Sequence, residues 1–413
     1  MSTPKNNSMF SRTSGRVNLI FLTIIFCALI MFSTASFGQT KDSTITIAQI
    51  KKINSKILGE ERTLYIRTPS KMRANETFPV MYIMDGEAFT EMASGQIQYL
   101  SESYKIIPSM IVVAIENTDR TRDLTPTHFN LGPDGMPDTS ANAFGKNSGG
   151  GEKFIQFIKT ELMPFIEKQY PVSPYKILAG HSLGGLMAVY CMTEHPEYFN
   201  AYIAISPSLQ WDNGALLKQM PAKLNSKKLE NKYLFFSDAN EGAQFHANQL
   251  TFDSVLKQKD IVGFKYKYFY YPEESHTSEP VKALYDGIRL VYPEWYLTYN
   301  SAFRQKVNSA IIKDHYSKLS TTYGYKVVPL QEEIIQVSRF LRNDPKRIND
   351  AIDLLQTYLP YYPAAANMQE LLGDIYLKAG DSKNALSVYE KVLTMDPKNE
   401  GVKAKIKQIA ANG

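Results

Sequence analysis

The segment Gly-His-Ser-Leu-Gly-Gly at residues 180–185 places a serine where nucleophilic chemistry could occur. The apolar stretch Ile177–Ala179 precedes it and the helix-forming stretch Leu186–Met192 follows it, which predicts a strand, a sharp turn and a helix. Glycines at both ends of the turn permit a strained backbone that exposes the serine hydroxyl, and the helix N-terminus supplies positive potential for an oxyanion. The pattern predicts a nucleophile elbow with Ser182 as nucleophile.

A serine hydroxyl needs a base to remove its proton, and a histidine is the usual base. His276 follows the expected strand Phe264–Tyr270, and active sites of open α/β sheets lie at the carboxyl ends of strands. In hydrolases that carry a nucleophile elbow, the chain order is serine, acid, histidine. Four other histidines are disfavoured: His128 and His195 come too early in the chain, and His246 and His315 are better explained as helix-surface residues. We therefore predict that His276 is the base.

The acid that orients this base should follow the expected strand Tyr233–Phe236. The next residues are Ser-Asp-Ala-Asn-Glu-Gly, so Asp238 and Glu241 are both within reach. One of the two is expected to be a solvated or turn-forming carboxylate, since Asp commonly stabilises such turns. Spacing alone leaves both open.

The elements that must position these residues lie between Leu64 and about Leu290, where β-branched and aromatic stretches alternate with helical patterns. This alternation predicts a mostly parallel sheet covered by helices. A polar stretch, residues 117–151, is long enough to carry function. A helix from Phe154 to Ile166 follows it, with Pro164 expected to bend it. The expected strands are Thr63–Arg67, Val80–Met84, Met110–Ile115, Lys176–Ala179, Ala201–Ile205, Tyr233–Phe236 and Phe264–Tyr270.

After Trp295 the chain shows helical patterns alone, with residues repeating at a spacing of 34: Ala351 and Pro363 recur as Ala385 and Pro397. The second copy fits a tetratricopeptide pattern and the first is degenerate. Because about three repeats are needed to bury a continuous core, we expect this region to pack against the preceding domain. The expected packing anchors are aromatic: Tyr296, Tyr299, Phe303, Tyr316, Tyr323 and Tyr325.

The chain start resembles a secretory leader: Lys5, Arg12 and Arg16 precede the apolar stretch Leu19–Phe32 and then small residues. That stretch is shorter than the roughly 20 residues that cross a bilayer, which favours a cleaved signal over a retained anchor. Three of the five excess positive charges lie here, so the rest of the chain does not suggest a nucleic-acid partner. We predict a signal peptide (1–38), a hydrolase domain (39–298) and a helical domain (299–413). After cleavage Cys191 is the one remaining cysteine, which excludes an intramolecular disulfide.

These motifs together resemble an esterase branch of the α/β hydrolases that includes esterase D-like and enterochelin esterase-like proteins. The resemblance covers roughly residues 50–295. It rests on Val80–Gly86, Ile111–Asn117, Arg122–Pro126, the helix Phe154–Pro164, the elbow, Ser206–Ser208 and the His276 loop.

The resemblance implies an α/β-hydrolase fold followed by an all-α, tetratricopeptide-like domain. It also implies Glu241 rather than Asp238 as the acid, because relatives often carry a Glu a few residues beyond the corresponding strand. Backbone amides of Leu183 and of Gly86 or Glu87 are implied as the oxyanion hole.

Two further residues are candidate substrate contacts. Trp211 follows Ser206–Ser208, from where its ring could form a wall of the cleft, with core packing as the alternative. Arg122 could meet an acidic group of the substrate, although ion pairing within the long loop is favoured.

The function we predict is an exported, periplasmic or secreted serine hydrolase that cleaves carboxylic esters through an acyl-enzyme, without metal or cofactor. The resemblance implies three candidate substrate classes: siderophore esters, acylated glycans and small acyl esters. The alternative is a binding protein in which the helical repeats act and the hydrolase domain is a scaffold. The repeats could also bind a protein partner or form a dimer contact.

Overall fold

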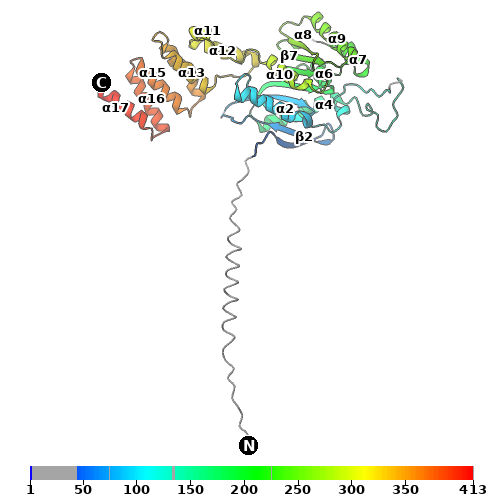
Figure 1. The fold of residues 1–413 in the computed structure, drawn as a ribbon, viewed down its shortest axis with the longest axis horizontal. Helices are drawn as coiled ribbons and strands as arrows, with labels where there is room; N and C mark the ends of the chain where they lie inside the picture. Colours follow the sequence, from blue (N-terminus) through cyan, green and yellow to red (C-terminus); the bar gives the residue numbers. More distant parts are fainter. Residues whose placement is uncertain (2–43, 74, 133–134, 225, 413) are drawn as a thin grey trace. The chain divides into compact units, whose positions relative to one another are not determined.

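The computed structural model describes Met1 and residues 44–73, 75–132, 135–224 and 226–412. Apart from Met1, the predicted signal peptide lies outside the described residues. Residues 47–413 cluster as one compact unit, and Figure 1 shows its elements along the chain. Within the described ranges, no helix combines the length and hydropathy needed to cross a bilayer.

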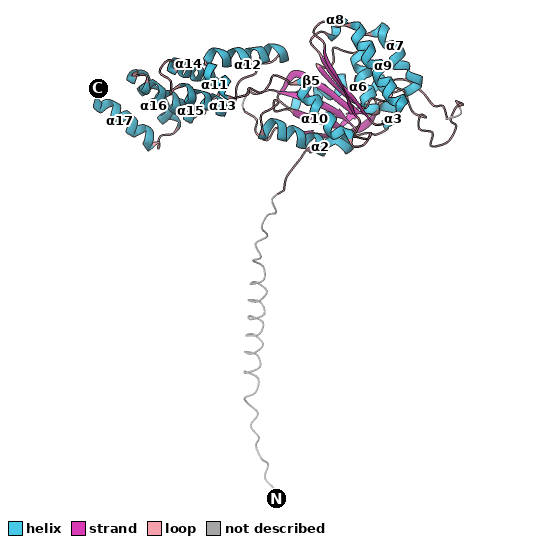
Figure 2. Cartoon of the chain, turned by 45° about the horizontal axis from the view of Figure 1, so that its top comes forward, coloured by secondary structure: helices cyan, strands magenta, loops and turns pink. Residues whose placement is uncertain are grey.

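One sheet of eight strands forms the centre of this unit in the described residues, in the order β1-β2-β4-β3-β5-β6-β7-β8. Figure 2 shows its strands in magenta among the helices. The pairs β1–β2 and β2–β4 are antiparallel, and all other pairs are parallel. The strands are β1 (Gln49–Ser55), β2 (Glu60–Arg67), β3 (Phe78–Met84), β4 (Ile111–Ile115), β5 (Val172–His181), β6 (Ala201–Ile205), β7 (Tyr233–Ala239) and β8 (Lys265–Tyr271).

The strand order reverses around β3, which lies between β4 and β5. Ile83 of β3 pairs with Ala179 of β5, so these two strands end side by side. In open α/β sheets a crevice forms outside the carboxyl ends of the strands at such a switch point. The segments that follow β3 and β5 therefore meet at one place.

Helices cover both faces of the sheet because its central strands are apolar on both sides. One buried cluster joins alternate strand residues to α2 and α10 and continues into the C-terminal helices. The other joins the opposite strand face to α4–α7 and α9. The helices are α2 (Gly86–Gln98), α3 (Arg120–Asp123), α4 (Gly151–Phe157), α5 (Met163–Gln169), α6 (Leu183–Glu194), α7 (Trp211–Lys223), α8 (Ser226–Leu229), α9 (Ala243–Lys259) and α10 (Glu279–Val291).

Beyond α10 the described chain is helical. Gly373 of α15 explains how α15 and α16 approach closely, since a Cβ there would lie 2.5 Å from the Tyr389 ring. The helices are α11 (Ser301–Lys306), α12 (Ser309–Tyr323), α13 (Gln331–Leu341), α14 (Ile348–Tyr358), α15 (Ala366–Lys378), α16 (Ser382–Met395) and α17 (Glu400–Asn412). Short π and 3-10 segments also occur: η1 (Tyr99–Ser103), η2 (Ile158–Leu162) and η3 (Leu359–Tyr361).

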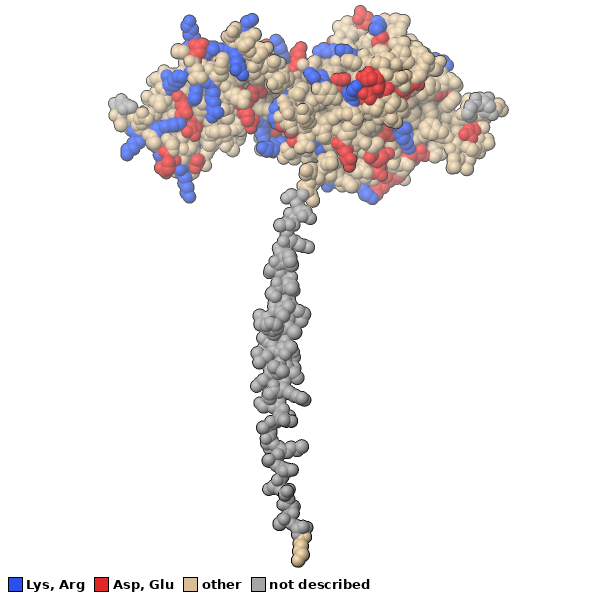
Figure 3. Space-filling view, viewed as in Figure 1, with Lys and Arg blue, Asp and Glu red and all other residues tan. Residues whose placement is uncertain are grey.

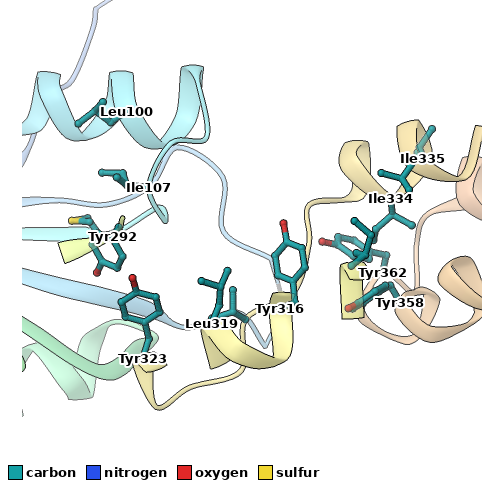
Figure 4. Close-up of a cluster of buried hydrophobic side chains, with 14 of the residues drawn as sticks. Leu100, Ile107, Tyr292, Tyr316, Leu319, Tyr323, Ile334, Ile335, Tyr358 and Tyr362 are labelled. Carbon is teal, nitrogen blue, oxygen red and sulfur yellow. The ribbon is translucent and has the colours of Figure 1, made fainter. Parts of the chain in front are cut away.

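Aromatic side chains pack the helical region against the α/β part. Tyr323 lies with its ring 5.1 Å from Tyr175 and 5.0 Å from Tyr292, and its hydroxyl donates to the Val291 carbonyl over 3.0 Å. Figure 4 shows this cluster continuing through Tyr316 to Tyr362. The expected packing is present at Tyr316 and Tyr323, with Tyr175 and Tyr292 supplying the α/β side. The expectation was wrong for Tyr296, whose side chain is exposed.

The predicted strands are present, most with small shifts of their ends. β5 extends four residues before and two residues beyond the predicted Lys176–Ala179, and β1 was not predicted. It is an edge strand with alternating exposed and partly buried residues, so its polar sequence lacks the apolar signal of a central strand. The helix expected from Phe154 to Ile166 is divided by η2, and Pro164 lies in the first turn of α5. The space-filling face in Figure 3 shows acidic and basic side chains interspersed.

Candidate active site

Ser182 forms a sharp turn between β5 and α6. Its φ of 60° and ψ of −116° lie in a strained region for a residue with a Cβ. The Ser182 N–H donates to the Ile205 carbonyl over 2.9 Å, which fixes the turn against β6. The strand ends at His181 and the helix begins at Leu183, so the backbone has the strand–turn–helix form of a nucleophile elbow.

Two glycines make this turn sterically possible. A Cβ at Gly180 would lie 2.5 Å from the Gly184 carbonyl carbon, and one at Gly185 would lie 2.8 Å from the Ile205 oxygen. Both obstacles are backbone atoms, which cannot move aside as a flexible side chain could. The close approach of α6 to β5 and β6 therefore requires glycine at these positions.

The backbone amides of Leu183, Gly86 and Glu87 belong to the first turns of α6 and α2. Such N–H groups have no acceptor within their own helix, so they can donate to an anion. The two helix starts are close together, since a Cβ at Gly184 would lie 3.4 Å from Asp85 Oδ2. This arrangement suits an oxyanion between the helices.

Asp85 supports this region from the end of β3. Its carboxylate accepts two hydrogen bonds from Arg120, at 2.6 and 3.0 Å, and one from the Asn117 amide at 2.6 Å. Glu87 accepts from the same Asn117 amide over 2.7 Å. These contacts tie the start of α2 to the segment after β4, which fits a structural use of Asp85.

His276 pairs with Glu241. Nδ1 of the imidazole donates to Glu241 Oε2 over 2.5 Å, which leaves Nε2 available for another partner. Burial raises the pKa of Glu241, but hydrogen bonds from His276 and Ser206 outweigh it and leave the pKa below its usual value. Glu241 is therefore ionised beside His276 at neutral pH.

Asp238, the other candidate acid, has different partners. Its buried carboxylate accepts from His246 Nδ1 and from the Tyr268 hydroxyl, each over 2.7 Å. Burial raises its pKa, although these bonds oppose the rise. The structure thus pairs Asp238 with His246, and Glu241 with His276.

The Ser182 hydroxyl lies 3.2 Å from the Ser208 hydroxyl. Across the described residues, no hydrogen bond joins it to His276. Contacts between nucleophile and base often tighten only when substrate binds. The elements that carry them are nevertheless adjacent, because the ring of His276 packs 4.4 Å from the ring of His181, the residue before Ser182.

Three residues at this site had no sequence-based assignment. Burial, and then the nearby His276, lowers the pKa of His181 to about 4, so this ring is neutral beneath His276 at neutral pH. Ser206 Oγ lies 2.5 Å from Glu241 Oε1 and also contacts Oε2 of the buried Glu279. Ser206 was noticed as part of a motif, whereas no sequence pattern indicated Glu279.

The Trp211 side chain packs against the long loop. Its indole N–H donates to the Thr127 carbonyl over 3.1 Å, and its ring packs on Phe129 and Phe144. These rings line a cavity of about 210 Å³. A substrate contact from Trp211 stays a prediction, and it would involve this cavity.

Arg122 is engaged by carboxylates. Its guanidinium forms two bonds to Glu60, at 2.6 and 3.0 Å, and one to Asp123 at 2.7 Å. Asp123 in turn contacts the buried Arg62 over 2.5 Å. The geometry fits ion pairing that holds the loop to β2. A substrate contact by Arg122 stays a prediction, because its Nε, Nη1 and Nη2 atoms all donate to Asp123 or Glu60.

A larger cavity of about 880 Å³ lies at the junction with the C-terminal helices, lined by residues such as Trp295, Tyr325 and Tyr362. It contains none of Ser182, His276 and Glu241. Its size alone does not make it the reaction site, because the residues able to perform nucleophilic chemistry lie elsewhere.

Comparisons with known proteins agree with this fold. Residues 55–250 match the family described as Putative esterase, and residues 366–399 match the tetratricopeptide repeat. The ferri-bacillibactin esterase BesA of Bacillus subtilis is 27% identical over 227 residues, which are 52% of this chain and 76% of that protein. A siderophore enterobactin esterase of Emericella nidulans is 32% identical over 154 residues, which are 34% of this chain and 49% of that protein.

Among solved structures, an IroE-like serine hydrolase from Shewanella oneidensis is 29% identical, with a TM-score of 0.62. The match covers 80% of this chain and 99% of that one. The α/β-hydrolase fold with a C-terminal tetratricopeptide-like region is therefore confirmed, and the chain is an ester hydrolase. Its residues 55–250 are similar to the esterase family of the α/β hydrolases that the motifs indicated.

Proposed function

We propose that this protein is an exported serine esterase in which Ser182, His276 and Glu241 form the triad. The observation that carries the proposal is the 2.5 Å bond between His276 Nδ1 and Glu241 Oε2, at the switch point where the strained Ser182 turn lies. Glu241 holds the imidazole so that Nε2 faces the nucleophile and stabilises the imidazolium that forms.

The reaction follows from this arrangement. His276 takes the Ser182 proton as Oγ attacks the ester carbonyl, and the amides of Leu183 and of Gly86 or Glu87 bind the resulting oxyanion. His276 then gives the proton to the leaving alcohol. Water, activated by the same imidazole, hydrolyses the acyl-enzyme and restores Ser182.

Siderophore esters are the substrate class that we favour. Several relatives are named for siderophore ester cleavage, including the two described above and a triacetylfusarinine C esterase of Aspergillus fumigatus that is 27% identical over 181 residues. Acylated glycans and small acyl esters are the other candidates. The scaffold alternative, with the helical repeats as the functional part, is not favoured by these relatives.

Export rests on the predicted leader, and the proposed domains are residues 39–298 and 299–413. The tetratricopeptide match supports a protein-binding use of the helical region, whereas a dimer contact has no specific support. N-terminal sequencing of the protein from fractionated cells tests the leader: a start near residue 39 supports cleavage, and a start at Met1 contradicts it.

A panel of esters tests the activity itself. It should contain a catecholate trilactone, an acetylated oligosaccharide and p-nitrophenyl esters. We expect the wild type to cleave the trilactone with the highest kcat/KM and Ser182→Ala to lose a factor on the order of 10³ or more. Preference for the oligosaccharide would favour acylated glycans over siderophore esters as the substrate class. Full activity of Ser182→Ala would contradict the triad.

A further inference from the structure

Glu279, the first residue of α10, is a fully buried acid next to the proposed triad. Glutamate is rarely buried without a partner of opposite charge. Its Oε2 contacts the Ser206 hydroxyl, while Oε1 has no hydrogen-bond partner among the described residues. Among the described residues, no salt bridge involves Glu279. The proposed reaction gives this residue no role.

The Ser206 hydroxyl has only one hydrogen but contacts two carboxyl groups. Its Oγ lies 2.5 Å from Oε1 of Glu241 and in contact with Oε2 of Glu279. A hydroxyl has one hydrogen to donate and two lone pairs to accept. Because a carboxylate can only accept, both contacts are hydrogen bonds only if one of the two acids is protonated.

The surroundings decide which acid holds that proton. Glu241 accepts from His276, and the Ala239 N–H lies 3.4 Å from its Oε1, so its negative charge is stabilised. Glu279 faces the ends of β6 and β7, where its charged neighbours are the carboxylates of Glu241 and Asp238. Tyr271 of β8 is a further titratable neighbour, and its hydroxyl is bound to Asp286.

Electrostatics agree with this geometry. Burial raises the pKa of Glu279 to about 7, the hydroxyls of Ser206 and Ser237 oppose the rise, and Glu241 and Asp238 add to it. Around and below neutral pH a large share of Glu279 is therefore the neutral acid.

We propose that protonated Glu279 is a positioning residue that fixes Glu241 through Ser206. The carboxyl O–H of Glu279 donates a hydrogen bond to Ser206 Oγ, and the Ser206 O–H donates a hydrogen bond to Glu241 Oε1. Glu241 Oε2 then accepts from His276 Nδ1, so the chain runs from α10 to the base. This inference rests on the proposed triad, and it adds that the triad works best with one negative charge at this site rather than two.

The pH profile of kcat/KM tests this role. In the wild type we expect activity to fall as Glu279 ionises above about pH 7, because two buried carboxylates then compete for one hydroxyl. Glu279→Gln cannot ionise but can donate an amide N–H, so it should lack this alkaline fall and keep at least about ten times the kcat of Glu279→Leu. Glu273→Gln, at an exposed acid bound to Lys282, is the matched control and should keep the wild-type profile.

Infrared spectroscopy provides a readout that needs no turnover. The wild type at pH 6 should show a C=O stretching band of a protonated carboxyl that is missing in Glu279→Gln, provided both proteins keep the same circular dichroism spectrum. Loss of the band in Ser182→Ala is not expected.

If the band is absent from wild type while Ser182 still reacts with an acylating probe, the protonated-Glu279 assignment is overturned and the triad stands. If the band is present but Ser182 is unreactive, the proposed triad fails instead. An alkaline fall that persists in Glu279→Gln, or equal kcat for the Gln and Leu variants, also overturns the positioning role.

Discussion

His276 donates to Glu241 rather than to Asp238, over a distance of 2.5 Å between Nδ1 and Oε2. The two acids are three residues apart at the end of the same strand, yet each meets a different histidine. This separation is what allows their roles to be tested independently.

Glu241→Gln should lower kcat by roughly 10²–10⁴, because the imidazolium of His276 loses its charged partner. Asp238→Asn should cost much less, since Asp238 contacts His246 and Tyr268. Steady-state kinetics on one activated ester measures both variants. If Asp238→Asn is the more damaged, the acid role belongs to Asp238.

Gly180→Ala should disrupt the elbow, because the added Cβ would lie 2.5 Å from the backbone of Gly184. We expect loss of about 1–3 kcal/mol of stability, the cost typical of overpacking a buried site, or failure to fold. Gly95→Ala in α2 is the control, since nothing lies within 4 Å of a Cβ there. That variant should gain about 0.5–1 kcal/mol from helix propensity. Urea denaturation compares them, and equal stability of the two variants would contradict the tight elbow.

Tyr323→Ala should lower the free energy of unfolding by about 3–5 kcal/mol, because this buried ring packs on Tyr175, Tyr292 and Trp295. Tyr296 is about half exposed, so Tyr296→Ala should stay within about 0.5 kcal/mol of wild type. A chain ending at Tyr299 should also lose stability or solubility. An unchanged melting temperature and unchanged kcat/KM in residues 39–299 would show that the helices do not stabilise the hydrolase.

The stability of Glu279→Gln relative to wild type should depend on pH. Since the folded-state pKa of Glu279 is raised from 4.5 to about 7, its contribution to stability is fully present below pH 4.5 and is lost as the pH rises to about 7. The Gln variant should therefore gain relative stability across this window, by up to about 3 kcal/mol, and level off above it. Thermal melts at several pH values measure the gain. Glu273→Gln should not show it, and a flat difference for Glu279→Gln would mean that Glu279 is ionised in the folded state.

The sequence predicted those parts of the site that depend on local pattern. Gly180, Ser182 and Gly184 indicate the elbow because a strand and a helix flank them closely, and His276 is recognised from the strand before it. Spacing could not choose between Asp238 and Glu241, since their partners depend on how the chain turns after β7; the resemblance favoured the acid that the structure pairs with His276. Glu279 escaped prediction because it meets Ser206 across 73 positions of sequence, a contact that exists only in the folded chain. The edge strand β1 was missed because it buries little apolar surface.

The most direct test of Ser182 as the nucleophile is the position at which a fluorophosphonate probe reacts. Labelled protein is digested and the modified serine is identified by mass spectrometry, with Ser182→Ala and Ser208→Ala in parallel, because the two hydroxyls lie 3.2 Å apart. We expect one label per chain at Ser182, retained in Ser208→Ala and lost in Ser182→Ala. A label on another serine, or no label on folded protein that still cleaves esters, would contradict Ser182 as the nucleophile.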